Sequence, residues 1–485
     1  MGKRQAPPSS ASASSNCTAH SPTTSQTTAT NADPSQSSAY YKEHSISISS
    51  DNNTILTPYT TFSQLKDDQK LKKSLMKPFK GFEKPTPIQA SVWPYLFAGH
   101  DVVGIAKTGS GKTFAFALPA VHIIKKQHST SKILALVLSP TRELAIQTHE
   151  SFAAFGPKAH IHPFVMYGGT SKKEQKADFL KSQCNVLVAT PGRLMDFMND
   201  GVVDLRAVQI VILDEADRML SFGFEQDIKT IMSSFRTARP QTIMFSATWP
   251  PEIRALAATY LSAPTTRITV GSDELAANTD ITQIVEVIGP DAKEARLLHI
   301  LKQHATAPTA GEHNLVLIFV LYKYEAPKLE KLLSSHRGGY AGMVASIHGD
   351  KNQRDRLHAL ESFKSGKTPI LVATDVAARG LDIPEVRCVI NFTYPLTTEE
   401  YCHRIGRTGR AGRKGVAYTF FTSNEKNHAG ALVNVLKKAN QTVPQALINF
   451  GTTVKRKVDP NYGAFTKDVD MSVKGKKIKF TCDDE

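Results

Sequence analysis

The stretch Ala106-Lys-Thr-Gly-Ser-Gly-Lys-Thr113 directly follows the apolar run Val102–Ala106 and precedes an apolar helix candidate that starts at Phe114. Its two glycines, Gly109 and Gly111, allow the backbone to curl so that successive N–H groups face one point. The following helix adds the partial positive charge of its N-terminus at the same point, so the loop is suited to hold phosphate oxygens. A strand, a glycine-rich loop and a helix in this order predict a mononucleotide-binding α/β unit.

Two side chains of this loop complete the predicted phosphate site. Lys112 is expected to reach the β- and γ-phosphates of a nucleotide, and the Thr113 hydroxyl is expected to bind Mg²⁺. The usual pattern GxxxxGK[ST] is broken at its first position, where Ala106 replaces glycine. A glycine-rich turn without a ligand is the alternative, but the strand–loop–helix context favours the phosphate site.

An acidic cluster, Asp214-Glu215-Ala216-Asp217, follows the apolar run Gln209–Leu213. An aspartate at the end of a strand beside a phosphate loop is the usual place for holding Mg²⁺, directly or through water, which points to Asp214. The next carboxylate, Glu215, can orient the attacking water or accept its proton. Acidic residues also collect at helix N-termini because of the helix dipole. The position at a strand's carboxyl end favours the catalytic interpretation.

From about residue 61 the chain alternates short apolar strands with amphipathic helices. The strands are near-continuous Val, Ile and Leu runs, which is typical of a parallel sheet buried on both faces. A polar segment, Gly271–Asp280, separates two groups of strands and predicts two α/β domains. The strand candidates are Val102–Ala106, Ile133–Leu138, Val186–Thr190, Ile210–Asp214, Thr242–Ser246, Gln283–Ile288, Leu315–Leu321, Ile370–Thr374, Arg387–Asn391 and Val416–Phe421.

Composition shifts divide the chain into five predicted segments. Ser and Thr fill 20 of the first 50 positions, and such a stretch buries too little apolar surface to offset its ordering entropy. The last residues are basic, with Lys455-Arg-Lys457 and a lysine cluster from Lys474, and either a solvated tail or an RNA contact or nuclear-import patch explains them. The segments are a disordered Ser/Thr-rich leader (1–60), a first domain (61–270), a linker (271–281), a second domain (282–445) and a basic C-terminal tail (446–485).

Overall composition narrows the class of protein. The 485 residues are 41% hydrophobic, which excludes a fully disordered chain and a collagen-like fibre. The formal net charge of +15 favours a polyanionic partner, either nucleic acid or an acidic membrane surface. No apolar run approaches the roughly 18–20 residues that span a bilayer. The five cysteines form an odd set without a CxxC pair, which indicates reduced thiols in a cytosolic or nuclear compartment.

These motifs, with others in a fixed order, resemble those of the DEAD-box RNA helicases of superfamily 2. The resemblance covers residue 62 to about residue 440. It implies two tandem RecA-like α/β domains with parallel sheets, ATP as the nucleotide and RNA as the ligand. The further matching motifs are Pro140-Thr-Arg-Glu-Leu-Ala145, Gly168-Gly169, Thr190-Pro-Gly-Arg193, Ser246-Ala-Thr248, Ile318-Phe319, His348-Gly-Asp350 with Gln353 and Arg356, Ala373-Thr-Asp-Val-Ala-Ala-Arg-Gly-Leu-Asp382 and His403-Arg-Ile-Gly-Arg-Thr-Gly-Arg410.

The segment Gly81-Phe-Glu-Lys-Pro-Thr-Pro-Ile-Gln89 resembles the family's adenine-reading motif. A glutamine amide can match the N6/N7 edge of adenine, which guanine does not offer, so the nucleotide is implied to be ATP with Mg²⁺. Asp382 resembles the family's ribose contact. The residues implied to bind the nucleotide are Phe62, Phe82, Thr86, Gln89, Ala106, Lys107, Thr108, Gly109, Ser110, Gly111, Lys112, Thr113, Asp382 and His403.

The resemblance also implies that the second domain completes the ATP site. Arg407 and Arg410 are three residues apart, so on a helix they project from one face and together neutralise charge on the γ-phosphoryl group. Such arginines contribute roughly 10³–10⁵ in rate in other phosphoryl-transfer enzymes. The implied catalytic set is Lys112, Asp214, Glu215, Arg407 and Arg410. The implied coupling segment is Ser246, Ala247 and Thr248, which is expected to link hydrolysis to RNA separation through hydrogen bonds to the acidic loop.

RNA is implied to lie against small and basic residues of both domains. Contacts of this kind go to phosphates and 2′-hydroxyls, so they favour RNA over DNA with little sequence choice. Arg142 has a structural alternative, because it is equally suited to pair with a nearby acid. The implied RNA-binding residues are Pro140, Thr141, Arg142, Glu143, Gly168, Gly169, Thr190, Pro191, Gly192, Arg193, Thr374 and Asp375.

Two flanking segments, Ala277–Val287 and Ala464–Asp470, resemble fungal nucleolar members that act in large-subunit ribosome assembly. The resemblance implies an RNA-stimulated ATPase that unwinds short duplexes or remodels RNA–protein complexes during pre-rRNA processing. It further implies a nuclear and nucleolar monomer with pre-ribosomal protein partners and no membrane association. An ATP-dependent RNA clamp or scaffold would use the same motifs and stays open as the alternative. A P-loop kinase or GTPase is disfavoured by Gln89 and by the paired arginines.

Overall fold

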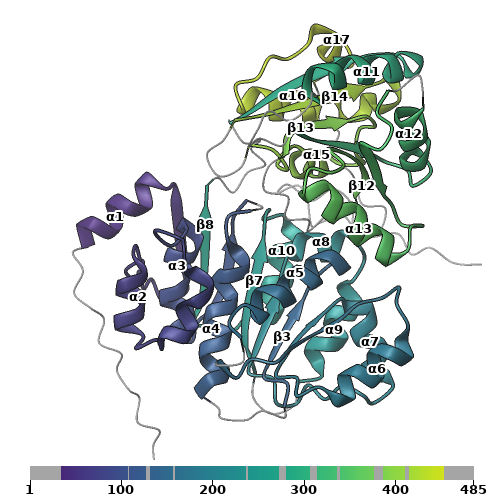
Figure 1. The fold of residues 1–485 in the computed structure, drawn as a ribbon. Helices are drawn as coiled ribbons and strands as arrows, with labels where there is room; N and C mark the ends of the chain where they lie inside the picture. The colour runs from purple at the N-terminus through teal and green to yellow at the C-terminus, as the bar shows by residue number, and fades with distance from the viewer. Residues whose placement is uncertain are drawn as a thin grey trace, which may run out of the picture.

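The computed structural model describes residues 34–107, 109–126, 132–156, 159–235, 239–271, 280–305, 314–335, 339–375, 386–409 and 414–452. Within these ranges the chain forms two α/β domains, the first in the lower part of Figure 1 and the second above it. Each domain is a sheet with helices on both faces. The predicted fold class, two tandem RecA-like domains with parallel sheets, is confirmed.

The first domain is built on an eight-stranded sheet. All neighbouring strands run parallel except β1, which pairs antiparallel with β8. The strands β2, β3, β5 and β6 are buried along their whole length, because helices cover both faces of the sheet. In sheet order the strands are β1 (Ile46–Ser50), β8 (Thr265–Val270), β2 (Asp101–Ile105), β7 (Gln241–Ser246), β6 (Ile210–Leu213), β3 (Ala135–Leu138), β5 (Val186–Ala189) and β4 (Pro163–Met166).

Two apolar cores fill the spaces between this sheet and its helices. On one face α3, α4 and α5 bury Trp93, Phe116 and Phe152. On the other face α7 and α9 bury Phe197 and Ile228. The helices are α1 (Pro34–Glu43), α2 (Phe62–Asp68), α3 (Pro87–Phe97), α4 (Lys112–Lys126), α5 (Arg142–Ala153), α6 (Lys172–Lys181), α7 (Pro191–Asn199), α8 (Ala216–Ser221), α9 (Glu225–Ser233) and α10 (Pro251–Tyr260), with a 3₁₀ segment η1 (Lys73–Phe79).

The second domain has a six-stranded, fully parallel sheet with an apolar core on each face. In sheet order its strands are β11 (Val344–Ile347), β12 (Ile370–Thr374), β10 (Leu315–Val320), β13 (Val386–Asn391), β14 (Gly415–Phe421) and β9 (Ile281–Val287). Its helices are α11 (Lys293–His304), α12 (Glu325–Ser334), α13 (Gln353–Lys364), α15 (Thr398–Ile405), α16 (Ala429–Lys438) and α17 (Gln445–Ile448), with short 3₁₀ segments η3 (Pro290–Ala292) and η4 (Ser423–His428).

The predicted leader at residues 1–60 is wrong over residues 34–60. Residues 34–43 form α1, and β1 extends the first sheet by pairing with β8. The physical reason is the alternation in Ile46-Ser-Ile48-Ser, which puts both isoleucines on one face of the strand, where they pack against the first core. The Tyr41 hydroxyl then ties the segment down by donating to the Leu56 carbonyl at 2.6 Å. Residues 1–33 lie outside the described residues.

Two other predicted boundaries move by a few residues. The second domain does not end at residue 445, because α17 begins there and Leu447 is fully buried in the core beneath α16. The second domain starts with β9 at Ile281, inside the predicted linker, of which residues 272–279 lie outside the described ranges. Residues 453–485 of the predicted tail also lie outside them. Among the helices that the structure describes, none is both long and apolar enough to cross a bilayer.

The parallel order of the strands brings the motifs together. In a parallel sheet the carboxyl ends of all strands lie at one edge, and ligands bind outside that edge. In the first domain the segments that follow β2, β3, β5, β6 and β7 are the phosphate loop, the 140–143 and 190–193 segments, the acidic cluster and the 246–248 segment. In the second domain the segments after β10, β12 and β13 meet in the same way.

Candidate active site

The phosphate loop is shaped by its own lysine and glycines. The buried Lys112 amine donates to the carbonyls of Ala106 at 2.7 Å and Lys107 at 3.0 Å, so it closes the loop across its mouth. Gly109 and Gly111 both have positive φ angles, 77° and 90°, that only glycine adopts without strain. The predicted strand–loop–helix arrangement is present, since α4 begins at Lys112 directly after the second glycine.

Gln89 joins the adenine-reading segment to the phosphate loop. Its Oε1 accepts from the Thr86 backbone N–H at 3.1 Å, and its Nε2 donates to the Gly111 carbonyl at 3.0 Å. A primary amide has two N–H donors and two acceptor lone pairs, so one donor and one acceptor stay available for an adenine edge. A side chain at position 111 is excluded as well, because its Cβ would lie 2.7 Å from Gln89 Nε2.

The two predicted catalytic carboxylates follow β6 in sequence. Asp214 and Glu215 are both buried, with 3% and 9% of their surface exposed. Glu215 has φ 52° and ψ 54°, a left-handed conformation that costs a non-glycine residue about 1–3 kcal/mol. Strain of this kind is retained where the surrounding structure enforces it, and here it places two carboxylates in succession at the edge of the sheet.

The charges in this site perturb one another strongly. The pKa of the Asp214 carboxyl is raised to about 7, mainly by burial and then by the Glu215 carboxylate, while the Lys112 ammonium opposes the shift. Burial likewise lowers the pKa of Lys112, against the attraction of Glu215 and Asp214. Perturbed groups of opposite sign in one buried place are typical of a catalytic site. Added positive charge would hold Asp214 in its ionised form.

The donor set in this site fits Mg²⁺. Magnesium keeps several water ligands and is usually held by one or two carboxylates together with substrate phosphates. Asp214 supplies a carboxylate and Thr113 a hydroxyl, both from segments at the same sheet edge. Within the described ranges there is no group of three or more His, Cys, Asp and Glu side chains arranged to hold a metal. One carboxylate and one hydroxyl match the few protein ligands of a magnesium ion that is also held by nucleotide phosphates.

The coupling segment contacts the acidic cluster through Asp217. The Asp217 carboxylate oxygen Oδ2 accepts from the Ala247 N–H at 3.2 Å, the Thr248 N–H at 3.1 Å and the Thr248 hydroxyl at 2.9 Å. Asp217 belongs to α8, which starts directly after Glu215. The predicted hydrogen bonds between residues 246–248 and the acidic loop are thus present, and the loop partner is Asp217.

An ion pair joins the two domains. Arg356 Nη2 of α13 lies 2.6 Å from Glu143 Oε1 of α5, with side-chain exposures of 6% and 5%. Gln353 Nε2 of α13 donates to the same Glu143 oxygen at 3.3 Å. In Figure 1, α13 accordingly lies on the side of the second domain that faces the first. The Glu143 carboxylate is thus engaged by the second domain, not free for the RNA contact that we predict for it.

Arg407 brings a second-domain charge to the phosphate loop. It follows α15, is 5% exposed, and its positive charge contributes to the lowered pKa of Lys112 in the first domain. One charge changes the pKa of another only when the two lie close together, because the Coulomb energy falls with distance. The Arg407 charge therefore lies near Lys112 of the phosphate loop.

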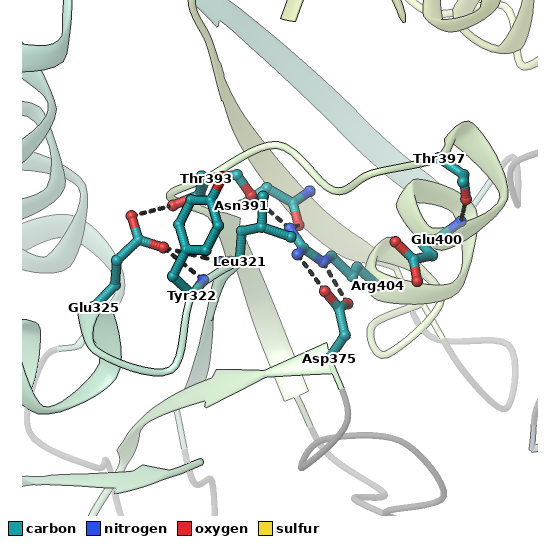
Figure 2. A network of polar contacts seen from close by, with 9 residues as sticks. All are labelled: Leu321, Tyr322, Glu325, Asp375, Asn391, Thr393, Thr397, Glu400 and Arg404. Atoms are coloured by element: carbon teal, nitrogen blue, oxygen red, sulfur yellow. Dashed lines mark hydrogen bonds and ion pairs between the residues drawn. The ribbon is translucent and has the colours of Figure 1, made fainter. Parts of the chain in front are cut away.

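A polar network inside the second domain fixes the arginine-bearing helix (Figure 2). Arg404 is 1% exposed and binds the Asp375 carboxylate through two N–H groups, at 2.7 and 2.5 Å. Its Nη1 donates to the Thr393 carbonyl at 2.6 Å. The Asp375 carboxylate, which we predict to contact RNA, is therefore occupied by Arg404. An RNA contact at Thr374-Asp375 would have to come from the backbone or from the Thr374 hydroxyl.

The predicted RNA-binding residues of the first domain line the same sheet edge. Thr141 is the N-cap of α5 and Thr190 precedes Pro191 at the start of α7, so two helix N-termini open toward this edge. A Cβ at Gly168 or Gly192 would meet no atom within 4 Å, which leaves their backbone open to a close ligand. These placements permit contacts to phosphates.

Two arginines complete this surface. The Arg142 guanidinium lies over Gly169, where any Cβ would come within 2.1 Å of its Nη1. Arg193 is 8% exposed, donates to the Thr170 carbonyl at 3.0 Å and lies 3.6 Å from Asp196. In the part of the chain that the structure describes, Arg142 forms no ion pair, so the structural alternative that we considered for it has no support there.

Comparisons with known proteins decide the family. The family model described as "DEAD/DEAH box helicase" matches residues 86–256, and that described as "Helicase conserved C-terminal domain" matches residues 292–412. The chain is 51% identical over 443 residues to the ATP-dependent RNA helicase DBP3 of Candida glabrata, covering 91% of this chain and 80% of that protein. It is 50% identical over 442 residues to the protein of the same name from Saccharomyces cerevisiae, covering 91% and 82%.

The chain belongs to the DEAD-box family of ATP-dependent RNA helicases. Solved structures agree. That of Mss116p bound to ssRNA and AMP-PNP is 27% identical with a TM-score of 0.69, covering 82% of this chain and 82% of that chain. That of S. cerevisiae Dbp5 bound to RNA and ADP BeF3 is 27% identical with a TM-score of 0.66, covering 80% and 99%. The chain is thus an RNA-stimulated ATPase of the helicase class.

Three predicted site residues of this helicase, Thr108, Asp382 and Arg410, lie outside the described residues. Of the other nucleotide residues, Phe62 is half-buried against Phe79 and Trp93, whereas Phe82 is 58% exposed. Lys107 and Gly109 are exposed, and the remaining loop residues Ser110 and Thr113 are partly buried, as is His403. Pro140 is buried behind the start of α5.

Three functional contacts were not assigned from the sequence of this helicase. Arg356 and Gln353 appear in the motif match, but their partner Glu143 is far away in the chain. The third contact is the one between Arg404 and Asp375. Nothing in the spacing of the motif distinguishes Arg404 from Arg407 or indicates Asp375 as its partner. The one signal in the sequence is the residue type. An arginine within a buried helix usually has an acidic partner, because arginine is rarely fully buried unless it is paired.

Proposed function

We propose that this helicase hydrolyses Mg²⁺–ATP to separate short RNA duplexes or to remodel RNA–protein complexes. The observation that carries the proposal is the position of Arg407, a buried second-domain arginine whose charge acts on Lys112 in the first-domain phosphate loop. An ATP site made from two domains gives hydrolysis a direct link to domain movement. Movement of two domains that each contact RNA can distort a strand.

The residues of the two domains have distinct roles in the proposed reaction. Lys112 exchanges its contacts with the loop carbonyls for the β- and γ-phosphates. Asp214 and Thr113 would hold Mg²⁺, which would neutralise charge on those phosphates. Glu215, locked by its backbone conformation, orients the attacking water and accepts its proton. Arg407, with Arg410, stabilises the charge on the γ-phosphoryl group as it transfers.

The proposed link from hydrolysis to RNA runs through Asp217. Its carboxylate holds the Ala247 and Thr248 backbone and the Thr248 hydroxyl, and it lies two residues from Glu215 in the chain. A shift of the acidic loop when the γ-phosphate leaves would therefore be passed to the segment 246–248. Because ATP and RNA both favour the closed arrangement of the domains, each tightens the binding of the other.

The test of this proposal is Arg407→Ala in the full chain. We expect its RNA-stimulated ATPase rate to fall by about 10³-fold or more, because the arginine acts on the transition state, while its affinity for ATP changes little. Steady-state ATPase assays and nucleotide-binding titrations measure the two quantities. Arg206→Ala is the matched control, because Arg206 is exposed and pairs only locally with Asp204. An ATPase rate close to that of the control would remove Arg407 from the proposed site.

We further propose that the RNA is pre-rRNA and that the helicase acts in large-subunit ribosome assembly, in the nucleus and nucleolus, as a monomer with pre-ribosomal protein partners. Support comes from the resemblance of residues 277–287 and 464–470 to fungal nucleolar members of the family. Crosslinking in cells followed by sequencing of the bound RNA tests it. Enrichment of large-subunit precursor sequences is expected, and a profile dominated by messenger RNA would reject this assignment.

An ATP-dependent RNA clamp remains the second candidate function. The buried ion pair between Glu143 and Arg356 favours it, because a strong interdomain contact prolongs the closed state in which RNA is held. Two measurements separate the candidates: the rate of displacement of a short labelled duplex, and the lifetime of the RNA complex with a non-hydrolysable ATP analogue. A long lifetime without displacement identifies a clamp.

A further inference from the structure

Two exposed tyrosines form an aromatic patch on the second domain. Among the described residues six large hydrophobic side chains are exposed, and two of them, Tyr322 and Tyr324, lie in the single turn between β10 and α12. Tyr322 is 50% and Tyr324 65% exposed. Their rings are stacked, with planes 9° apart and centroids 5.4 Å apart. We call this pair the tyrosine pair.

The turn that carries the tyrosine pair is rigid. Glu325 Oε2 accepts from the backbone N–H groups of Leu321 at 3.1 Å and Tyr322 at 2.9 Å. The backbone N–H of Glu325 donates to the Tyr322 carbonyl at 3.0 Å. The second carboxylate oxygen of Glu325 accepts from the Thr393 hydroxyl at 2.9 Å, as Figure 2 shows. The backbone that carries Tyr322 is therefore held in place before any ligand binds.

The same hydrogen bonds connect the turn to the predicted RNA edge. Thr393 accepts from Arg404, and Arg404 binds Asp375, so an unbroken polar chain runs from Tyr322 to Asp375 (Figure 2). The sheet register agrees, because Val320 at the end of β10 lies beside Thr374 at the end of β12. The tyrosine pair therefore follows the strand next to the predicted RNA contact at Thr374-Asp375.

The turn is also tied to the segment that faces the first domain. Lys323, between the two tyrosines, forms an ion pair with Asp350 at 2.9 Å. Asp350 lies just before α13, the helix whose Gln353 and Arg356 contact Glu143 of the first domain. The tyrosine pair is thus joined by hydrogen bonds to the predicted RNA edge, and its turn lies next to the segment that precedes the interdomain contact.

We propose that the tyrosine pair is a nucleobase-stacking platform for single-stranded RNA. This inference rests on the proposed RNA-remodelling function and adds a different kind of contact to it, because the other predicted contacts go to phosphates and 2′-hydroxyls. Exposed aromatic rings stack on any base, since every base presents a π-face. The two rings already contact each other, so a base stacks on the outer face of the pair. Their mutual stacking restricts both rings before binding, which lowers the entropy lost on binding.

RNA fits this patch better than a protein does. The patch lies at a predicted RNA edge of a chain with a net charge of +15, and base–aromatic stacking needs no more than one or two rings. A stable protein interface buries roughly 800 Å² on each partner, which is far more than two tyrosine rings present. A single-stranded base beside a backbone already bound at Thr374 is the occupant that matches both the size and the place.

The test compares intact RNA with abasic RNA of the same length, each bound to the full chain in the presence of a non-hydrolysable ATP analogue. Fluorescence anisotropy gives the dissociation constants. Abasic sites keep the phosphates and sugars but remove the stacking face. We expect Tyr322→Ala/Tyr324→Ala to bind intact RNA about fivefold or more weakly than wild type, and to bind fully abasic RNA as wild type does. Tyr322→Phe/Tyr324→Phe, which keeps both rings, should bind both RNAs normally.

Leu180→Ala is the matched control, because Leu180 is equally exposed, at 64%, but lies on α6 of the first domain. Thermal unfolding of each variant checks that the turn still folds. The proposal is overturned if the double alanine variant binds intact RNA like wild type, in which case the pair is left as a protein contact. It is also overturned if binding to intact and abasic RNA weakens equally, because the pair would then act only by shaping the turn.

Failure of the proposed function gives a different result. A wild-type chain without RNA-stimulated ATPase or duplex displacement would reject that function, whereas the binding comparison needs no turnover. A chain that is active but insensitive to the tyrosine substitutions rejects only the stacking platform.

Discussion

At the scale of single residues, the active site depends on side chains held where they are unfavourable. Glu215 is in a left-handed conformation, Asp214 is a buried carboxyl, and Lys112 is a buried ammonium. The opposite charges of Lys112 and Asp214 partly compensate one another, whereas the Glu215 carboxylate opposes ionisation of Asp214 and its backbone conformation is enforced by the surrounding structure. A site of this type lowers the stability of the fold in return for catalysis. We therefore expect substitutions in it to lower the ATPase rate without lowering stability.

Glu215→Gln should lose turnover and keep binding. Glutamine has the same shape and can still orient water, but it cannot accept a proton, so we expect the ATPase rate to fall by about 10²-fold or more. Affinities for ATP and RNA should be close to wild type, as measured by titration with labelled ligands. Near-normal RNA-stimulated ATPase in this variant would exclude Glu215 as the base.

Asp214→Asn should stabilise the nucleotide-free helicase in a pH-dependent way. The pKa of Asp214 is raised from 3.8 to about 7, so between these values the folded chain keeps a proton that the unfolded chain releases. The contribution of this carboxyl to stability therefore decreases as pH rises from about 4 to 7, and is lowest above pH 7. Asparagine carries no charge, so the variant should melt at a higher temperature than wild type at pH 8.

The difference in melting temperature should shrink as pH falls from about 7 to 4 and be smallest below about pH 3, where the carboxyl is neutral in both states. Thermal unfolding at several pH values in the absence of nucleotide and Mg²⁺ measures it. Asp200→Asn, on the exposed Lys172–Asp200 pair, is the control and should show little pH-dependent effect. A variant that is less stable than wild type at pH 8 would mean that the Asp214 charge is better compensated than its burial indicates.

Residue identity in this site is predictable from the sequence where chemistry restricts it. Phosphate binding requires glycines and a lysine after a strand, and that pattern identifies Lys112 and its loop. The ion pairs Glu143–Arg356 and Asp375–Arg404 are different. Each joins residues that are separated in the chain, and a single sequence carries no signal about which acid meets which base. Long-range pairing therefore had to come from the structure.

At the scale of strands and helices, the carboxyl ends of the parallel strands determine where function gathers. The central strands could be predicted within a few residues, because their burial on both faces leaves continuous apolar runs. The strands β1, β4, β8 and β11 were not predicted. In β8 the sequence Thr265-Thr-Arg-Ile-Thr-Val270 is largely polar, and β1 pairs with it at the sheet edge. β1 and β8 therefore lack the continuous apolar runs that the central strands show.

Glu143→Gln should weaken the coupling between ATP and RNA. The Glu143–Arg356 pair joins α5 to α13 across the two domains, and removing one charge leaves the other buried and unpaired in the closed state. We expect the enhancement of RNA binding by an ATP analogue to fall by about tenfold. RNA-binding titrations with and without the analogue measure it. Asp200→Asn again serves as control, because it breaks an ion pair that does not join the domains.

If the analogue enhances RNA binding equally in Glu143→Gln and wild type, the ion pair contributes nothing to closure. The single variant Arg356→Met and the combination Glu143→Gln/Arg356→Met complete a double-mutant cycle. Because both charges are then absent, we expect part of the coupling to return relative to the single variant. That recovery would separate the unpaired charge from a general disturbance of α5.

At the scale of the whole molecule, the proposed function requires the two domains to share one nucleotide site. The first domain has two apolar cores of its own and carries the phosphate loop, the acidic cluster and one predicted RNA surface. The second domain supplies Arg407 and a second predicted RNA surface. Neither half contains the whole site. The division of the chain into two α/β domains was predictable because a polar segment interrupts the strand pattern, but the arrangement of one domain against the other was not.

The first domain alone, residues 34–271, should bind ATP but hydrolyse it poorly and without response to RNA. It has its own cores, so we expect it to fold, and the loop and Gln89 keep their contacts. It lacks Arg407, whose absence should lower the rate by about 10³-fold relative to the RNA-stimulated full chain. RNA that binds this fragment cannot recruit the second domain, so it cannot complete the nucleotide site. ATPase assays with and without single-stranded RNA measure this. A fragment that hydrolyses ATP as fast as the full chain, whether or not RNA is present, would show that one domain suffices, and the second would then have to act on RNA by itself.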